Sequence, residues 1–484
     1  MFKKNPLIKG TLTLIITGLL TRVIGFFFRI FLVQGLGADG IGIYQLVFPV
    51  QIFFCSFCSM GIQTVISSMV ASEKKQARII LKNALFISMI LSVLSSAFLY
   101  VFSDEISLYI LSETRCTKAL KYIAFSIPFA SLHTCICGYY YGIKKAAVPG
   151  VSQLIEQLVR VLATYLIYLA ATDNSINFTP ANAIIGAVIG EIASSLFCLL
   201  SLSIRRFTLF NMFYIKKIAV SSIPLTANRM MLSIFQSAEA ILIPLMLKIH
   251  GHSTVDSLSI YGVLTGMAIP FIMFPATITN SLSTLLLPAV SECDSNNNKK
   301  SIKRVTEKSI CLSIYLGIFC TGIFLKYGHE IGTFIFHNTT SGYYLFILSW
   351  LCTFMYLSTT LSSILNGLKH TTMTFIFNII SIAIRIFFTV FVVPVYGISA
   401  YMSGLLVSYA ILTLMEYTKV ALYTKARIYI FKNLVFPVFS VIFALKVSAL
   451  LPAFSYYPAA LLQNCIIGGA IYLFLIAIYC QKAL

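Results

Sequence analysis

The sequence predicts an all-α integral membrane protein with about fourteen transmembrane helices. Three observations lead to this fold class: 58% of the 484 residues are apolar, only 10% are charged, and the apolar residues come in runs long enough to span a bilayer. A soluble domain typically carries about 25% charged residues, and a soluble core of this size has no room for so much apolar surface. The net charge of +20 lies in short loops between the runs, so we expect membrane lipids as partners and no nucleic acid.

Each predicted span meets the requirement for roughly 20 predominantly apolar residues to cross the hydrocarbon layer. No small-residue cleavage site follows the first run, so we expect it to be retained rather than removed as a signal peptide. The loops are short and leave no room for a separate soluble domain. The runs lie near residues 10–33, 42–70, 79–102, 120–143, 147–171, 181–204, 218–247, 259–290, 309–327, 342–367, 372–395, 398–421, 433–451 and 459–480.

The placement of lysine and arginine predicts the orientation, because cytoplasmic loops carry the excess of these residues. With the N-terminus inside, 24 of the 35 Lys and Arg residues fall in inside segments, five fall outside and six lie within spans. A split that alternates correctly through every span is hard to obtain by accident. We therefore expect a multi-pass protein of the cell (plasma) membrane with both termini cytoplasmic.

An internal repeat divides the predicted helices into two halves. Six spans separate the members of each matched pair, so the halves have the same orientation, as in repeats related by a pseudo-twofold axis along the membrane normal. We expect six-helix lobes at residues 1–206 and 207–427, with two helices appended at 428–484. The matched pairs are Gly142 and Gly367, Arg160 and Arg385, Arg22 and Arg229, and the Ile-Tyr steps at 43–44 and 260–261.

Arginines inside the predicted spans are the strongest candidates for a substrate site. An arginine at the bilayer centre costs about 2.5–3.5 kcal/mol on insertion scales, so it should face protein or water and have a function there. At about 1.5 Å per helical residue, four of these arginines lie roughly 18–24 Å from the last cytoplasmic basic residue, and the fifth lies about two turns further out. A planar guanidinium suits phosphate, so they predict a cationic cavity between the lobes. The candidates are Arg22, Arg29, Arg160, Arg229 and Arg385.

Acidic residues within the spans leave a second interpretation open, in which the arginines serve internal ion pairs. Glu156 precedes Arg160 by four residues, which is a favourable helical pair. No acid lies within one helical turn of Arg22 or Arg229, which favours substrate contact at these two. The acids considered for ion pairing with arginine or for ion coupling are Glu156, Glu191 and Glu239. The amides considered for lining the cavity, with interhelical hydrogen bonding as the alternative, are Gln63, Gln153, Asn228 and Gln236.

No catalytic or metal-binding constellation stands out in the sequence. There is no Walker loop, HExxH motif or carboxylate dyad, so we expect no catalytic residue, no metal and no cofactor. Cys55 and Cys58 form a CxxC pattern. Nearly all of the twelve cysteines lie in apolar runs, however, and we interpret them as small apolar residues of membrane helices.

Six short runs carry a family resemblance: TRVIGF at 21–26, LGA at 36–38, GIYQL at 42–46, LSIYGVLTGMA at 258–268, FPA at 274–276 and LPAVSE at 287–292. They resemble the stage V sporulation protein B family, and the resemblance covers essentially the whole chain. It implies the polysaccharide transporter branch of the multidrug/oligosaccharidyl-lipid/polysaccharide (MOP) superfamily. Two six-helix lobes, alternating access and export of undecaprenyl-diphosphate-linked precursors are implied with it, in sporulation members for spore cortex peptidoglycan.

The related lipid II flippases line their cavity with arginines of the first helix, and the resemblance carries over to two positions. Arg22 matches one of these arginines, and Arg29 matches the second after a one-residue shift. The acid that usually follows the second arginine is Ile30 here. The likeness at this point is therefore closer to the superfamily than to the lipid II flippases.

Together, the residues and the resemblance lead us to expect a monomeric alternating-access flippase, and not an enzyme. Its cargo would be an undecaprenyl-diphosphate-linked oligosaccharide or peptidoglycan precursor. An inside-negative potential favours outward movement of negative charge by roughly 2.3 kcal/mol per charge per 100 mV, with ion coupling as the alternative drive. One alternative function is a cation-coupled multidrug (MATE-type) exporter, which should place carboxylates where this chain has arginines. The other is a membrane enzyme acting on lipid-linked sugars, for which the loops lack a catalytic set.

Overall fold

The structure is a computed structural model that describes residues 6–173, 175–202, 211–296, 298–450 and 457–482. Within these ranges the chain is helical almost throughout, and no described residue belongs to a β-strand. A helix satisfies its backbone N–H and C=O groups internally, which lipid requires because no water is there to do so. The predicted all-α membrane fold class is confirmed.

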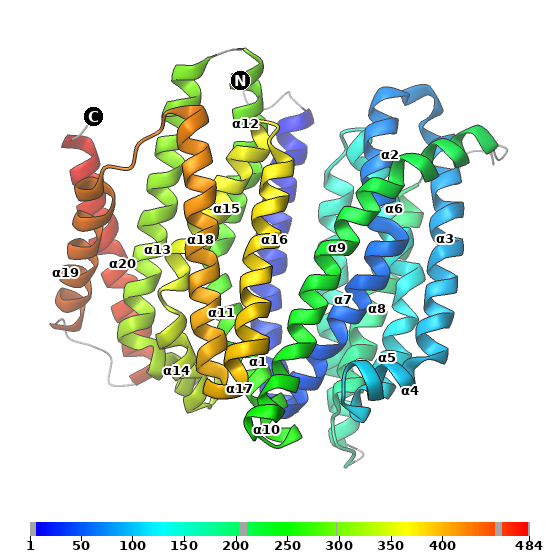
Figure 1. Ribbon diagram of the computed structural model, residues 1–484, viewed down its shortest axis with the longest axis horizontal. Helices are drawn as coiled ribbons and strands as arrows, with labels where there is room; N and C mark the ends of the chain where they lie inside the picture. The colour runs from blue at the N-terminus through cyan, green and yellow to red at the C-terminus, as the bar shows by residue number, and fades with distance from the viewer. Residues whose placement is uncertain (1–5, 174, 203–210, 297, 451–456, 483–484) are drawn as a thin grey trace. The chain divides into compact units, whose positions relative to one another are not determined.

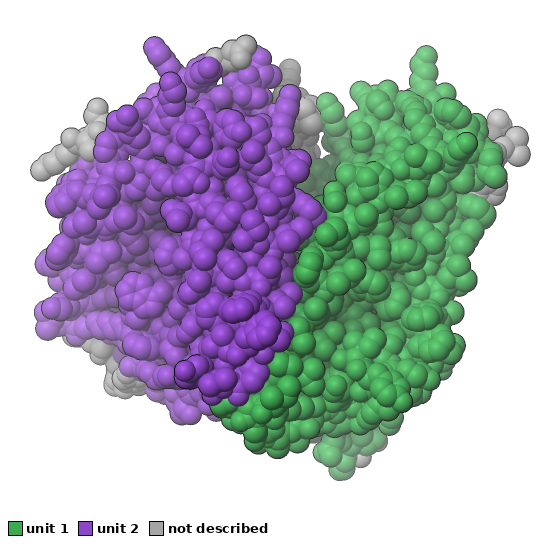
Figure 2. Space-filling view, in the orientation of Figure 1, with its two compact units in different colours: residues 1–262 green, residues 263–484 purple. Residues whose placement is uncertain are grey.

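The chain forms two compact units, unit 1 at Met1–Gly262 and unit 2 at Val263–Leu484 (Figure 2). The division falls within the segment predicted as the eighth span, so the long helix of the seventh span belongs to unit 1. The lobes at 1–206 and 207–427, with the appended 428–484, rest on the internal repeat and stay a prediction.

Unit 1 is a helical bundle in which α2, α3, α6, α7, α8 and α9 run side by side, with α10 packed against α1 (Figure 1). Short 3-10 and π-helical segments join several of these helices. The helices are α1 (Pro6–Cys55), α2 (Gly61–Ser72), α3 (Ala77–Val101), α4 (Ser103–Glu105), α5 (Thr117–Ala124), α6 (Ser126–Gly142), α7 (Ala147–Asp173), α8 (Pro180–Ser201), α9 (Met212–His250) and α10 (Thr254–Gly262).

Unit 2 is a second bundle, built mainly from α12, α13, α15, α16 and α18, with α19 and α20 packed on each other and against α13 (Figure 1). The helices are α11 (Ile269–Met273), α12 (Ala276–Ser295), α13 (Lys299–Phe336), α14 (Thr339–Leu348), α15 (Leu351–Gly367), α16 (Thr371–Phe387), α17 (Val393–Tyr396), α18 (Ile398–Thr424), α19 (Phe436–Leu450) and α20 (Tyr457–Lys482).

Eleven described helices are long and apolar enough to cross a membrane, or thirteen if each of two bent helix pairs counts as one span. The first two predicted spans form one 57-residue run, Ile16–Ser72, which breaks at Gly37 (φ 69°, ψ 179°). Only glycine adopts this backbone conformation readily, so Gly37 separates the two spans. The described residues of every predicted span are mostly helical, with interior turns at 125, 274–275 and 349–350. The protein is a multi-pass membrane protein, while the count of fourteen stays a prediction.

Polar residues next to the apolar runs cap the first turns of α8 and α9. The Thr179 hydroxyl accepts a hydrogen bond from the Asn182 N–H at 3.4 Å, with Pro180 as the first residue of α8. The Asn211 side chain accepts from the N–H of Phe213 at 3.0 Å at the start of α9. Such caps satisfy backbone donors that the first helical turn leaves free. They explain locally why these two helices begin where they do.

Helices α7 and α8 pack at close range through two glycines spaced four residues apart. A Cβ atom at Gly186 would lie 2.0 Å from Thr164 Oγ1, and one at Gly190 would lie 2.7 Å from the carbonyl oxygen of Glu156. Small residues at this spacing let membrane helices approach closely. This packing holds the turn of α7 that carries Glu156 and Arg160 directly against α8.

A cluster of charged side chains links three segments of unit 1. Arg115 donates to both oxygens of Glu113, at 2.9 and 3.1 Å, and to both oxygens of Asp39, at 2.6 and 3.1 Å. Lys248 donates to the carbonyl oxygen of Ser112 at 2.8 Å. Burial by itself raises the pKa of Glu113, but the hydrogen bonds from Arg115 and the charges of Arg115 and Lys248 outweigh it and lower the pKa.

We expect this cluster to make stability depend on acid pH through Glu113. Because its pKa is lowered by folding, its contribution is fully present above the unfolded value near 4.3 and is lost as pH falls through the folded value. Since Arg115 is partly exposed, we expect Glu113 to contribute about 1 kcal/mol to the free energy of unfolding. Thermal unfolding in detergent should show Glu113→Gln less stable than the unsubstituted protein at pH 7, and this difference should shrink as the pH is lowered below the unfolded pKa. The exposed Glu105→Gln should show no such difference, and parallel pH profiles for Glu113→Gln would contradict the assignment.

Candidate functional site

Arg22 on α1 and Arg229 on α9 carry exposed side chains within long apolar helices of unit 1. Neither guanidinium forms an ion pair with a side chain that the structure describes. A guanidinium has five N–H donors and no acceptor, so these two groups have donors available for an anion from outside the protein. Contact with a substrate stays a prediction for both.

The next two arginines lie in a paired group inside unit 1. Arg160 forms an ion pair with Glu156, one turn earlier on α7, as the sequence predicts, and their side chains are 22% and 19% exposed. Arg29 of α1 interacts electrostatically with Arg160 and with Tyr44. The Nε atom of Arg160 is buried without a hydrogen-bond partner among the described residues. Arg29 and Arg160 are thus neighbouring guanidinium groups, and Arg160 is the one paired with Glu156.

His133 extends this polar group to α6 and α8. Its Nδ1 lies 3.1 Å from Glu191 Oε1 and 3.4 Å from Ser194 Oγ, while its Nε2 lies 2.9 Å from Ser152 Oγ. Glu156 interacts electrostatically with both Glu191 and His133. Glu191 thus has a histidine partner where the sequence predicts an arginine. Four helices, α1, α6, α7 and α8, contribute to one continuous set of polar side chains.

Arg385 lies in unit 2, on α16, and is held by neighbouring side chains. Its Nη1 donates to Ser381 Oγ at 3.3 Å, and its guanidinium carbon lies 5.7 Å from the ring centre of Tyr409 on α18. A cation over an aromatic face contributes roughly 0.5–2 kcal/mol. These contacts anchor Arg385 within its own unit.

The remaining candidate site residues differ in how exposed their side chains are. Glu239 of α9 is buried and Gln63 of α2 is half-buried. Three amides have exposed side chains, Asn228 and Gln236 on α9 and Gln153 on α7. Asn228 therefore shares with its neighbour Arg229 an exposed position on the same helix.

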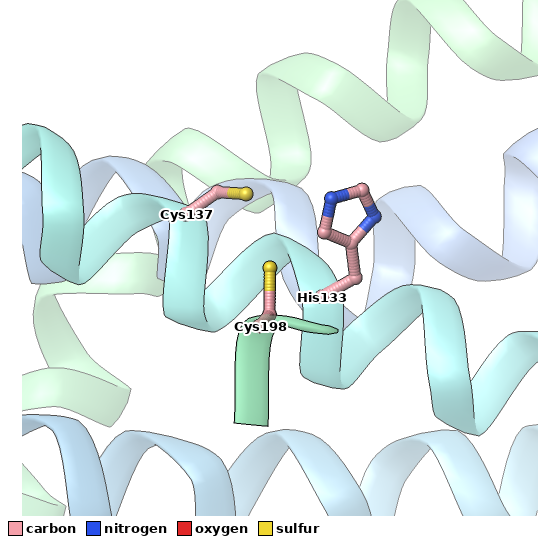
Figure 3. A group of neighbouring side chains, drawn as sticks. All are labelled: His133, Cys137 and Cys198. Carbon is pink, nitrogen blue, oxygen red and sulfur yellow. The ribbon is translucent and has the colours of Figure 1, made fainter. Parts of the chain in front are cut away.

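Several side chains that could bind a ligand or take part in chemistry were not predicted as site residues from the sequence. His133 and Cys137 lie four residues apart on α6, and Cys198 of α8 joins them to form a buried cluster (Figure 3). The spacing of His133 and Cys137 on one helix was the available signal, but Cys198 follows 61 residues later and no motif links it to the pair. In unit 2, Glu416 of α18 is fully buried and accepts a hydrogen bond from Ser362.

The two groups of arginines offer different chemistry. Exposed guanidiniums at positions 22 and 229 are suited to bidentate hydrogen bonds with phosphate oxygens. Arg160 already has a carboxylate partner, so binding an anion there would require the ion pair to open or to be shared. Exposure and ion pairing therefore separate Arg22 and Arg229 from the paired group around Arg160.

Comparison with known proteins agrees with this description. The polysaccharide biosynthesis protein family model matches residues 7–294. Stage V sporulation protein B of Bacillus subtilis is 24% identical over 381 residues, covering 76% of this chain and 74% of the relative. The lipid II flippase MurJ of the same organism is 20% identical over 349 residues, covering 64% of this chain and 62% of the relative.

Solved structures share the fold at low sequence identity. A lipid II flippase MurJ in an inward closed conformation superposes with a TM-score of 0.78 at 16% identity, covering 97% of this chain and 98% of that one. An inward-facing multidrug resistance MATE transporter of the MOP superfamily reaches a TM-score of 0.62 at 12% identity, covering 84% and 96%. The fold is therefore that of the MOP transporters.

Proposed function

Because the chain belongs to the polysaccharide biosynthesis protein family, we propose that it is a flippase for an undecaprenyl-diphosphate-linked oligosaccharide or peptidoglycan precursor. The relatives at sequence level include a sporulation protein and a lipid II flippase, and both names suit a cell-wall precursor as cargo. A role in spore cortex synthesis is part of the proposal.

The observation that carries the proposal is the exposure of Arg22 and Arg229 on apolar helices without an ion-pair partner among the described side chains. An unpaired arginine in a membrane span is costly, by about 2.5–3.5 kcal/mol at the bilayer centre, and is retained where it serves a substrate path. A diphosphate presents several oxygens to which two guanidiniums can donate at once. Arg29 and Arg385 are further candidates for binding the headgroup. Arg160 is a candidate for responding to headgroup binding through its ion pair with Glu156.

The membrane potential has the right sign to drive such a cycle, because an inside-negative potential favours outward movement of an anion. With both termini cytoplasmic, the diphosphate is taken from the inner leaflet and released outside, and the polyprenyl tail stays in lipid. Each negative charge moved outward gains roughly 2.3 kcal/mol per 100 mV. The protein acts as a monomer that alternates access, and no catalytic step or cofactor is part of the cycle.

A cation-coupled drug exporter is the second candidate, because MATE transporters share the fold. Such a site needs carboxylates available to cationic drugs. The carboxylates at positions 156 and 191 are instead engaged by Arg160 and His133. This pairing favours the anionic cargo.

The proposal is tested by binding of a polyprenyl-diphosphate-linked saccharide to purified protein, measured by native mass spectrometry. We expect Arg22→Ala and Arg229→Ala each to weaken binding roughly 10- to 100-fold, since a hydrogen bond to a charged group contributes about 1.5–3 kcal/mol. Arg78→Ala, which removes an exposed arginine at the start of α3, should bind like the unsubstituted protein. Flipping of the same lipid in liposomes should follow the order of binding.

Two outcomes would count against this function. Unchanged binding in both arginine variants would place the headgroup elsewhere. Absence of lipid binding, together with binding of cationic dyes that depends on Glu156 and Glu191, would favour the drug exporter.

A further inference from the structure

Three buried side chains of unit 1 converge from two helices at a point that the proposed function does not use. His133 and Cys137 lie on one face of α6, and Cys198 reaches them from α8 (Figure 3). Their exposed fractions are 8%, 6% and 0%. One ring nitrogen and the two sulfur atoms all lie within 4.8 Å of one another. Figure 3 shows the imidazole and both thiols directed toward the space that they share.

The two ring nitrogens of His133 have different surroundings. Nδ1 faces Glu191 Oε1 at 3.1 Å, whereas Nε2 lies 2.9 Å from Ser152 Oγ, which is itself 3.8 Å from Cys137 Sγ. A carboxylate on one imidazole nitrogen fixes the tautomer and leaves a lone pair on the other nitrogen. Metal-binding histidines have such a partner almost always. Nε2 is thus the nitrogen turned toward the sulfur atoms, and Glu191 supplies the supporting carboxylate.

We propose that His133, Cys137 and Cys198 bind a Zn²⁺ ion that joins α6 to α8. Zinc takes imidazole nitrogen and thiolate sulfur in tetrahedral sites, with bonds of about 2.0–2.3 Å. Such bonds place the donor atoms roughly 3.3–3.8 Å apart, so donors within 4.8 Å need to close by only about 1 Å. The Ser152 hydroxyl, 2.9 Å from His133 Nε2 and 3.8 Å from Cys137 Sγ, is the candidate for the fourth position, and water is the alternative there.

The charge balance of this site suits a membrane interior. Binding as thiolates releases one proton from each cysteine, and two thiolates with one neutral imidazole offset the two charges of the ion. A neutral complex avoids the cost of placing an uncompensated charge in low dielectric. Soft sulfur ligands also favour zinc over magnesium, calcium or manganese.

A second set of donors around the same histidine is less suitable. His133, Glu156 and Glu191 also approach within 4.8 Å of one another. Glu156, however, is engaged by Arg160, so using it as a ligand would leave that guanidinium without its carboxylate. The cysteine set leaves this ion pair intact and uses Glu191 as support for the histidine.

The position of the cluster along its helices indicates how an ion would reach it. Cys137 lies five residues before the end of α6 at Gly142, and Cys198 lies three residues before the end of α8 at Ser201. At about 1.5 Å per helical residue, both cysteines are within roughly 8 Å of helix ends that we expect at the cytoplasmic face. In the reducing cytoplasm thiols persist as such, which favours metal binding over a disulfide.

The test is zinc content of the purified full-length protein, prepared with reducing agent, supplied with Zn²⁺ alone and then desalted. We expect about one zinc per chain in the unsubstituted protein. The zinc content should be at least tenfold lower in Cys137→Ser/Cys198→Ser and in His133→Gln. The matched control is Cys320→Ser/Cys352→Ser, which removes two equally buried thiols of unit 2 and should keep its zinc. Cobalt in place of zinc should give thiolate-to-cobalt absorption that the same site variants lose.

A second readout separates metal binding from misfolding. A chelator should lower the Tm of the unsubstituted protein and leave the Tm of Cys137→Ser/Cys198→Ser unchanged, while both proteins elute as single species in size-exclusion chromatography. Zinc retained by the site variants, no zinc in the unsubstituted protein, or a complete Cys137–Cys198 disulfide by non-reducing mass spectrometry would each overturn the proposal. None of these results depends on whether the chain moves a lipid.

Discussion

Glu156→Gln is expected to destabilise the protein by about 3 kcal/mol. The substitution keeps the size of the side chain but removes the charge opposite Arg160, whose side chain is only 22% exposed. Removing one partner of a buried ion pair typically costs about 3–5 kcal/mol, because the other charge stays in low dielectric without compensation. The nearby charge of Arg29 adds to this cost, since it repels the same guanidinium. Thermal unfolding in detergent should show a clearly lower Tm.

The chain offers a matched control for this change. Lys303 and Glu307 form an ion pair at the same four-residue spacing on α13, at 3.8 Å, but with more exposed side chains. Glu307→Gln should therefore cost no more than about 0.5 kcal/mol. The double variant Glu156→Gln/Arg160→Gln should recover much of the lost stability, because it leaves no unpaired charge. Equal Tm values for Glu156→Gln and Glu307→Gln would mean that the pair on α7 is not effectively buried.

Gly262→Ala is expected to cost more than about 3 kcal/mol, at the upper end of what overpacking does. A Cβ atom at Gly262 would lie 2.2 Å from the carbonyl oxygen of Ala38, and one at Gly42 would lie 2.1 Å from that of Leu258. Backbone atoms cannot rotate away as a side chain can, so α1 and α10 would have to separate. The yield of monodisperse protein and its Tm in detergent should both fall, and Gly42→Ala should behave the same way.

Gly18→Ala is the control for this prediction. Gly18 also lies in α1, but a Cβ atom there would meet no atom within 4 Å. Alanine is the better helix former by roughly 0.5–1 kcal/mol, so this variant should be as stable as the unsubstituted protein or slightly more stable. A normal Tm for Gly262→Ala would contradict the close crossing of α1 and α10.

The crossing of α1 and α10 shows how sequence and structure complement each other. The Ile-Tyr steps at 43–44 and 260–261 were paired by the internal repeat alone. In the structure the glycines beside them, Gly42 and Gly262, lie in direct backbone contact. Similarity between two segments does not tell whether they touch, because similar segments can also occupy separate, equivalent places.

The sequence by itself determined the properties that depend on one helix at a time. Composition decided that the solvent is lipid, and the length of each apolar run decided where the helices lie, because a chain in hydrocarbon must satisfy its own backbone. Spacing along a single helix was enough to predict the Glu156–Arg160 pair. The same reasoning drew attention to Arg22 and Arg229 as charges without an acid one turn away.

Only the tertiary structure decided which side chains from different helices meet. It placed Glu191 against His133 rather than an arginine, and it brought Cys198 to His133 and Cys137. It also assigned α9 to unit 1. These outcomes depend on how each helix is rotated and how closely it approaches its neighbours, as at Gly186 and Gly190 between α7 and α8. Packing of this kind depends on many residues at once, so no local pattern along the chain encodes it.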